Sequence, residues 1–143
     1  MPASILLVDD EKGFVDTMAK RLGKRGLTVA TADSGQAGLA VLDGPGNVDV
    51  VILDVKMPGM DGIETLKTIK AAYPLVEVIM LTGHATVENA IEGMKLGAYD
   101  YMMKPCEMDE LLAKVEEAYQ KKQAQETRIL EARARHIELR RGD

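Results

Sequence analysis

The chain is poor in aromatic residues and almost without cysteine. It contains no tryptophan, one phenylalanine and four tyrosines among 143 residues, so aliphatic side chains and nine methionines must build its core. Cys106 is the only cysteine, which excludes an intramolecular disulfide and is typical of a protein in the reducing cytoplasm. The composition therefore predicts a cytoplasmic protein with room for one well-formed core.

Long hydrophobic runs are also missing. No stretch approaches the roughly 18 apolar residues that a membrane-spanning helix needs. No signal peptide is recognised, because Asp9 and Asp10 interrupt the first apolar run after only a few residues. We therefore expect no membrane segment.

Positive charge is scarce over most of the chain. The net charge is −5, but residues 119–143 carry seven Lys or Arg and four acids, which leaves −8 for residues 1–118. An acidic body argues against direct binding of nucleic acid, and the basic excess of the last 25 residues is too small to argue for it. The excess of acidic residues instead favours the binding of a cation.

Apolar segments of strand type alternate with segments of helical periodicity five times. Strands are expected at 5–8, 27–32, 48–53, 76–81 and 98–102, and helices at 11–25, after Ser34, at 63–72, at 87–95 and from about Glu107. Ser34 and Asp61 are plausible helix caps. Two strands are almost wholly apolar, as expected where helices cover both faces of a parallel sheet. The pattern predicts an α/β fold with a doubly wound, five-stranded parallel sheet.

The last helix is longer than a small domain requires. Its first part has a packing face that contains Leu111 and Val115, but helical composition continues to about Arg141. At 1.5 Å per residue, some thirty residues would extend about 50 Å, so much of the second half should project. We expect a domain at 1–120 and a helical C-terminal extension at 121–143.

A polar residue follows four of the predicted strands. Asp9 and Asp10 follow the first strand and Asp54 the third, while Thr82 ends the fourth and Lys104 the fifth. The carboxyl ends of parallel strands converge, so three carboxylates, a hydroxyl and an ammonium should meet there, with Thr82 about half exposed. Neighbouring carboxylates raise one another's pKa, which a hard divalent cation such as Mg²⁺ would relieve. Each residue alone also fits a helix cap, a turn or a solvated surface position.

Together these motifs resemble the receiver domain of bacterial two-component response regulators. The similarity covers about residues 3–120, and 82–90 is particularly similar to receivers of the nitrogen-regulation class. It implies sheet order 2-1-3-4-5. The segments that carry it are Leu7–Glu11, Leu53–Gly62, Leu81–His84 and Gly97–Pro105.

The resemblance implies a role for each matching residue. Asp54 would accept a phosphoryl group from a histidine kinase or phosphotransfer protein. Asp10 would bind Mg²⁺ directly and Asp9 through water, with Asp54 and the backbone carbonyl of Lys56 completing the protein ligands. Lys104 and Thr82 would bind phosphoryl oxygens, and Tyr101 would turn inward behind Thr82. Lys56 and His84 flank the route of water and would tune the lifetime of the phosphoryl group.

The resemblance implies a phosphorylation-dependent switch, with slow self-dephosphorylation and phosphorylation by small donors. Residues 121–143 contain no helix-turn-helix or ATPase segment, so output is expected through a downstream protein or a homodimer. The alternative is a receiver fragment of a larger transcriptional regulator. An aspartyl-phosphate hydrolase is disfavoured because Lys56 occupies the position of its second acid. A nucleotide or flavin site lacks its glycine-rich loop.

Overall fold

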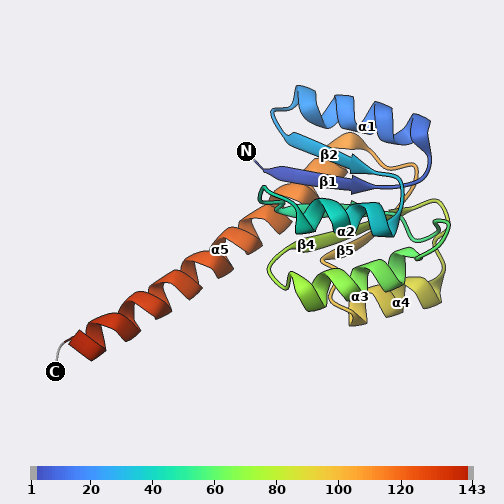
Figure 1. Cartoon of the computed structure of the whole chain (residues 1–143). Helices are drawn as coiled ribbons and strands as arrows, with labels where there is room; N and C mark the ends of the chain where they lie inside the picture. Colours follow the sequence, from blue (N-terminus) through green and yellow to red (C-terminus); the bar gives the residue numbers. More distant parts are fainter. Residues whose placement is uncertain (1–2, 142–143) are drawn as a thin grey trace.

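The five strands form one parallel sheet in the order β2-β1-β3-β4-β5, which confirms the predicted fold class. The structure is a computed structural model and describes residues 3–141. Because every pair is parallel, all strands point to the same edge, as the arrows of β1 and β2 show in Figure 1. Their bounds are β1 Ser4–Val8, β2 Thr28–Ala32, β3 Val50–Leu53, β4 Glu77–Thr82 and β5 Asp100–Met103.

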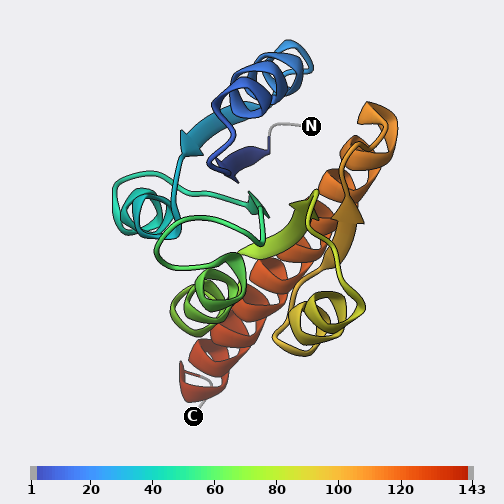
Figure 2. The same ribbon diagram turned by 90° about the vertical axis from the view of Figure 1, so that its right-hand side faces the viewer.

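Helices cover both faces of the sheet (Figures 1 and 2). One face packs against α1 and α5, and its core includes Leu22 and Leu111; the other packs against α2, α3 and α4, with Leu66 and Ile69 in its core. Buried aliphatic side chains therefore separate three layers, as the composition predicts. The helix bounds are α1 Lys12–Lys24, α2 Gly35–Asp43, α3 Gly62–Ala72, α4 Val87–Lys95 and α5 Met108–Arg141.

Side-chain caps fix the starts of three helices. The hydroxyl of Ser34 accepts a hydrogen bond from the Ala37 amide at 3.1 Å, and the Asp61 carboxylate accepts one from the Glu64 amide at 2.8 Å. Thr86 caps α4 in the same way. Each cap satisfies an amide that has no partner inside its helix, so the strand-to-helix turns have defined geometry.

Two strands begin two residues later than the sequence pattern predicts. β3 begins at Val50 rather than 48, and β5 begins at Asp100 rather than 98. The Ala98 amide closes the end of α4 by donating to the Gly93 carbonyl, so it is not available for the sheet. Hydrophobicity alone does not distinguish a strand residue from an apolar residue that ends a helix.

The long helix α5 leaves the body at the edge opposite the carboxyl ends of the strands (Figure 1). At its departure the ammonium of Lys122 lies 3.0 Å from Asp49 and 2.6 Å from Glu126, and the Lys122 side chain is only 4% exposed. Asp49 also accepts a hydrogen bond from the Ser4 amide. Residues 127–139 are exposed, so the predicted projection is observed. Between residues 3 and 141, no helix is both long and apolar enough to cross a bilayer.

Candidate functional site

Asp54 lies buried at the carboxyl end of β3, in the centre of the sheet. Its side chain is 1% exposed, and one carboxylate oxygen accepts a hydrogen bond from the Val55 amide at 2.8 Å. The turn that follows folds back closely, with the Gly62 amide donating to the Val55 carbonyl at 2.7 Å. A β-carbon at Gly62 would collide with the carbonyl oxygen of Asp54. Glycine there allows the turn to close against the site.

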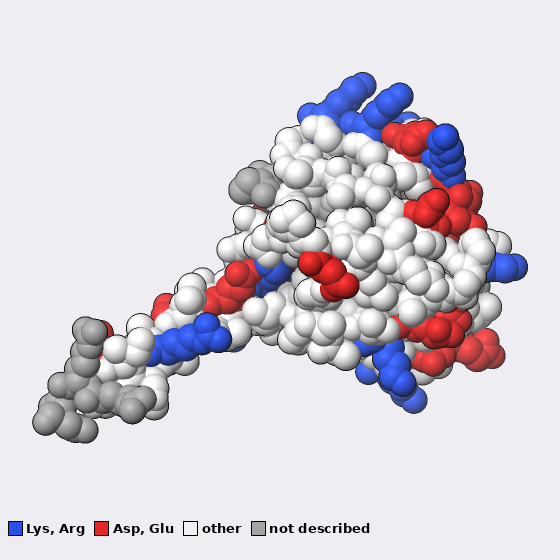
Figure 3. All heavy atoms as spheres, in the orientation of Figure 1, with Lys and Arg blue, Asp and Glu red and all other residues white. Residues whose placement is uncertain are grey.

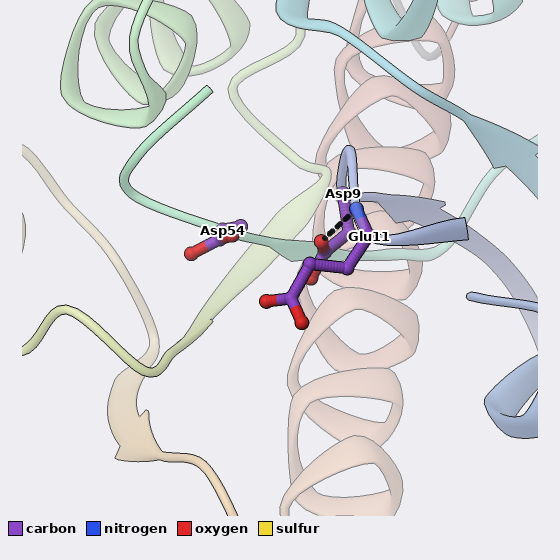
Figure 4. Close-up of side chains that lie close together, drawn as sticks. All are labelled: Asp9, Glu11 and Asp54. Atoms are coloured by element: carbon purple, nitrogen blue, oxygen red, sulfur yellow. Dashed lines mark hydrogen bonds between the residues drawn. The ribbon is translucent and has the colours of Figure 1, made fainter. Parts of the chain in front are cut away.

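Three carboxylates from two strand ends meet at this position. Oxygens of Asp9, Glu11 and Asp54 all lie within 4.8 Å of one another (Figure 4). Register explains the approach, because Val8 at the end of β1 pairs with Leu53 at the end of β3. Burial raises the pKa of Asp9, and the nearby charge of Asp54 adds to this effect. Negative charge is therefore concentrated here.

The ammonium of Lys104 faces this cluster from the end of β5. Its nitrogen lies 2.6 Å from Asp9, 3.0 Å from Glu11 and 3.8 Å from Asp54, and its side chain is 11% exposed. It also sits 4.0 Å from the centre of the Phe14 ring. Burial opposes the positive charge, but hydrogen bonds to Asp9 and Glu11 outweigh it and raise the pKa of Lys104. The Lys104–Pro105 peptide bond is cis.

Asp10, Lys56 and His84 are exposed and line an open cavity beside the carboxylates, with a volume of about 360 Å³. Asp10 lies outside the group of three close carboxylates, whereas Glu11, to which the sequence assigned no role, lies inside it. Figure 3 shows acidic side chains gathered along the edge to which the strands point. Two acids, Asp10 and Glu11, thus line the cavity together with Lys56 and His84.

Thr82 is fully buried, so the expectation that it is half exposed is wrong. The following turn covers it: the His84 amide donates to the Thr82 hydroxyl at 3.0 Å, and the Lys104 amide donates to its carbonyl. Tyr101 lies on the adjacent strand. Its hydroxyl is buried and has no hydrogen-bond partner among residues 3–141, and burial raises its pKa. Thr82 thus ends β4, the strand beside β3, and Tyr101 pairs with Met80 from the next strand, β5.

The arrangement combines an ionisable nucleophile with fixed countercharge. A carboxylate ionised at neutral pH needs no general base to attack phosphorus, and an ammonium beside it can stabilise incoming anionic oxygens. Neither Glu11 nor Phe14 was identified from sequence as a contact of Lys104. Their positions one turn apart at the start of α1 could have suggested it, since both face the strand ends.

The sequence model of the response regulator receiver domain matches residues 5–116, and the chain belongs to this family. It is a receiver domain of two-component response regulators. Receiver domains are switches that histidine kinases phosphorylate, and they generally bind Mg²⁺.

Individual relatives agree with this assignment. The chain is 37% identical to the DNA-binding transcriptional regulator NtrC of Salmonella typhimurium, over 85% of this chain and 26% of that protein. It is 40% identical to the transcriptional regulatory protein FixJ of Bradyrhizobium diazoefficiens, over 95% of this chain and 65% of that protein. A receiver domain protein from Clostridium thermocellum superposes with a TM-score of 0.80 at 37% identity, covering 85% and 98% of the two chains. The chain thus spans less than two thirds of the regulators NtrC and FixJ.

Proposed function

We propose that Asp54 accepts a phosphoryl group from the phosphohistidine of a sensor kinase or phosphotransfer protein. A carboxylate oxygen of Asp54 attacks phosphorus, the phosphorus–nitrogen bond breaks, and the imidazole nitrogen keeps the electron pair. The observation that carries this proposal is the ammonium of Lys104, held 3.8 Å from the buried Asp54 carboxylate. Transfer needs position and countercharge rather than the removal of a proton from the nucleophile.

The carboxylates of this site fit a magnesium ion. Three of them lie within 4.8 Å, and burial opposes the ionisation of Asp9, so a hard cation would relieve their repulsion. Asp9 and Asp54 of this group would hold it, together with Asp10, which lies outside the group, and the backbone carbonyl of Lys56. Bound there, Mg²⁺ would neutralise the charge that develops on the phosphoryl oxygens.

Acetyl phosphate and Mg²⁺ provide a direct test. The intact protein should gain one phosphoryl group, located by mass spectrometry at Asp54, and chelation of Mg²⁺ should prevent this. Asp54→Asn should abolish labelling, whereas Asp16→Asn, which alters an exposed acid on α1, should not. Equal labelling of Asp54→Asn and the wild-type chain would refute the assignment.

The switch is proposed to run through Thr82 to the surface formed by α4 and β5. A phosphoryl oxygen would take a hydrogen bond from the Thr82 hydroxyl, and Tyr101 would move inward behind it. The buried and unpaired Tyr101 hydroxyl supports this step, because a rearrangement that pairs it lowers the energy of the active state. Thr82→Ala should accept phosphate but show much smaller NMR shift changes in residues 85–101. Undiminished changes would place the coupling elsewhere.

Output is proposed to pass through a homodimer held partly by the C-terminal extension. Ile129, Leu130, Ile137 and Leu139 are exposed on α5, and a lone helix in water is marginally stable. Packing them against a second copy would bury this apolar surface. We further propose that the reaction takes place in the cytoplasm. We also expect no direct contact with nucleic acid, because residues 1–118 carry a net negative charge.

Truncation after Thr127 tests the dimer, because it removes the exposed segment but keeps Lys122 and Glu126. Sedimentation should show weaker association than the full chain at matched concentration, with phosphorylation of Asp54 unchanged. If both proteins stay monomeric with and without beryllofluoride, the dimer is wrong and a downstream protein is the better partner.

A receiver segment of a larger transcriptional regulator is the second reading. It is favoured because the chain spans only 26% of NtrC. In that case other parts of the regulator would contact DNA, and the chemistry at Asp54 would be the same.

A further inference from the structure

Glu11 differs from the other carboxylates around Lys104 in its exposure. The side chain of Glu11 is 58% exposed, whereas those of Asp9 and Asp54 are 2% and 1% exposed. Its oxygen nevertheless lies 3.0 Å from the Lys104 nitrogen, closer than Asp54 at 3.8 Å. Although Glu11 precedes α1, its side chain makes no capping hydrogen bond. Its one ion pair among residues 3–141 is with Lys104.

The Lys104 ammonium has three N–H donors, and two of them are engaged by Asp9 and Glu11. The Phe14 ring lies 4.0 Å away on the same ammonium. The third donor is left for a phosphoryl oxygen, and because the ammonium lies 3.8 Å from Asp54, a shift toward Asp54 would strengthen that bond. Of the two hydrogen bonds, the one to exposed Glu11 is the weaker, because water screens it and competes for it. The Lys104–Glu11 hydrogen bond is therefore the easier of the two to break.

We propose that Glu11 is a positioning residue that holds Lys104 back from Asp54 and thereby slows phosphorylation. It does not touch the reacting atoms; it acts by competing for the ammonium that the phosphoryl oxygens need. This inference rests on the proposed function of Asp54. It predicts that releasing Lys104 from Glu11 speeds phosphoryl transfer.

Two substitutions separate this effect from simple charge repulsion of the donor. Glu11→Gln removes the charge at nearly constant size, whereas Glu11→Asp keeps the charge but shortens the side chain by one carbon, so that it falls short of Lys104. If Glu11 acts through Lys104, both variants speed transfer. If Glu11 only repels an anionic donor, Glu11→Gln alone does so, and salt removes the difference.

The measurement is the initial rate of Asp54 phosphorylation by acetyl phosphate with saturating Mg²⁺. A carboxylate oxygen attacks phosphorus, the phosphorus–oxygen bond to acetate breaks, and acetate leaves with the electron pair. Both variants should react about twofold to fivefold faster, the effect of losing one exposed charged contact. Asp16→Asn on the exposed face of α1 is the matched control and should react at the wild-type rate.

An independent readout is the NMR signal of the Lys104 ammonium in protein with labelled lysine. Loss of the Glu11 carboxylate beside Lys104 should shift this signal in both variants but not in Asp16→Asn. Unchanged rates in Glu11→Gln and Glu11→Asp, or acceleration in Glu11→Gln alone, would overturn the inference while Asp54 still takes phosphate. A wild-type chain that is not phosphorylated at Asp54 would overturn the proposed function as well.

Discussion

Lys122 forms the most deeply buried ion pair described for this chain, and its removal should be costly. Its side chain and that of Asp49 are 4% and 7% exposed, and their charged atoms are 3.0 Å apart. Lys122→Met keeps most of the aliphatic stem but leaves the Asp49 carboxylate buried, with the Ser4 amide as its remaining hydrogen-bond donor. Breaking a buried pair on one side costs about 3–5 kcal/mol, because the other charge stays uncompensated. We expect a loss of this size in the free energy of unfolding.

A second variant tests whether the buried charge is the cause. Adding Asp49→Asn to Lys122→Met keeps an oxygen for the Ser4 amide but removes the stranded charge, so the double variant should recover about half of the loss or more. Lys121→Met is the matched control. Lys121 is 47% exposed and its partner Glu77 keeps Lys70, so its removal should cost less than about 1 kcal/mol.

Urea denaturation followed by far-ultraviolet circular dichroism measures all four proteins. Unfolding free energies are compared at equal slope, since a changed slope would indicate a changed denatured state. The reasoning fails if Lys122→Met costs no more than Lys121→Met, or if the double variant is no more stable than Lys122→Met alone. Either result would mean that water reaches the pair more freely than its burial implies.

Three further predictions concern the site. Burial raises the pKa of Asp9, so its ionisation opposes folding: the cost is absent below the ordinary pKa of 3.8 and fully present above the raised value. Without Mg²⁺, Asp9→Asn should therefore gain stability over the wild-type chain as pH rises from about 4 to 7 in urea titrations, and parallel curves would contradict this. Gly62→Ala should destabilise by about 1–3 kcal/mol through its backbone collision. Gly13→Ala, which meets nothing within 4 Å, should be neutral or stabilising, and equal losses in thermal melts would refute the distinction. Replacing both Lys56 and His84 with alanine should change the rate of dephosphorylation, in which water attacks phosphorus and releases inorganic phosphate; an unchanged rate would assign them no part in it.

The fold was largely predictable because local signals agreed with one another. The predicted bounds of α4, Val87–Lys95, are those observed. Ser34 and Asp61 cap the helices that they were expected to cap. Each cap stood between a predicted strand and an apolar periodicity of 3.6, so three independent indications placed the same boundary.

The sequence predicted which residues form the site better than it predicted how they are arranged. Alternation of strands and helices brings Asp9, Asp54 and Lys104 together whatever their side-chain angles, and the structure shows them in contact range. The burial of Thr82 depends on how the following turn lies, which no periodicity encodes. Glu11 looked like one more acid at a helix start, because the sequence does not show that a lysine 93 residues away reaches it.

The ion pair between Lys122 and Asp49 at the base of α5 could not be predicted from the sequence, for a related reason. Lys122 lies 73 residues from Asp49 and follows a run of charged and polar residues, so it reads as a solvated position. Only the packed sheet shows that this lysine points inward. Long-range polar contacts of this kind carry no local pattern, whereas apolar faces do.

The single anchored base of α5 has a mechanical consequence. From Lys122 to Arg141 the helix rises about 28 Å, at 1.5 Å per residue. A tilt of about 10° at the base would therefore swing the tip by about 5 Å, several times the displacement at the base itself. The exposed apolar side chains of Ile137 and Leu139 lie near the end of this helix. If two such helices were joined near their C-terminal ends, each would oppose a tilt that the other does not make. The two receiver domains would then have to move together.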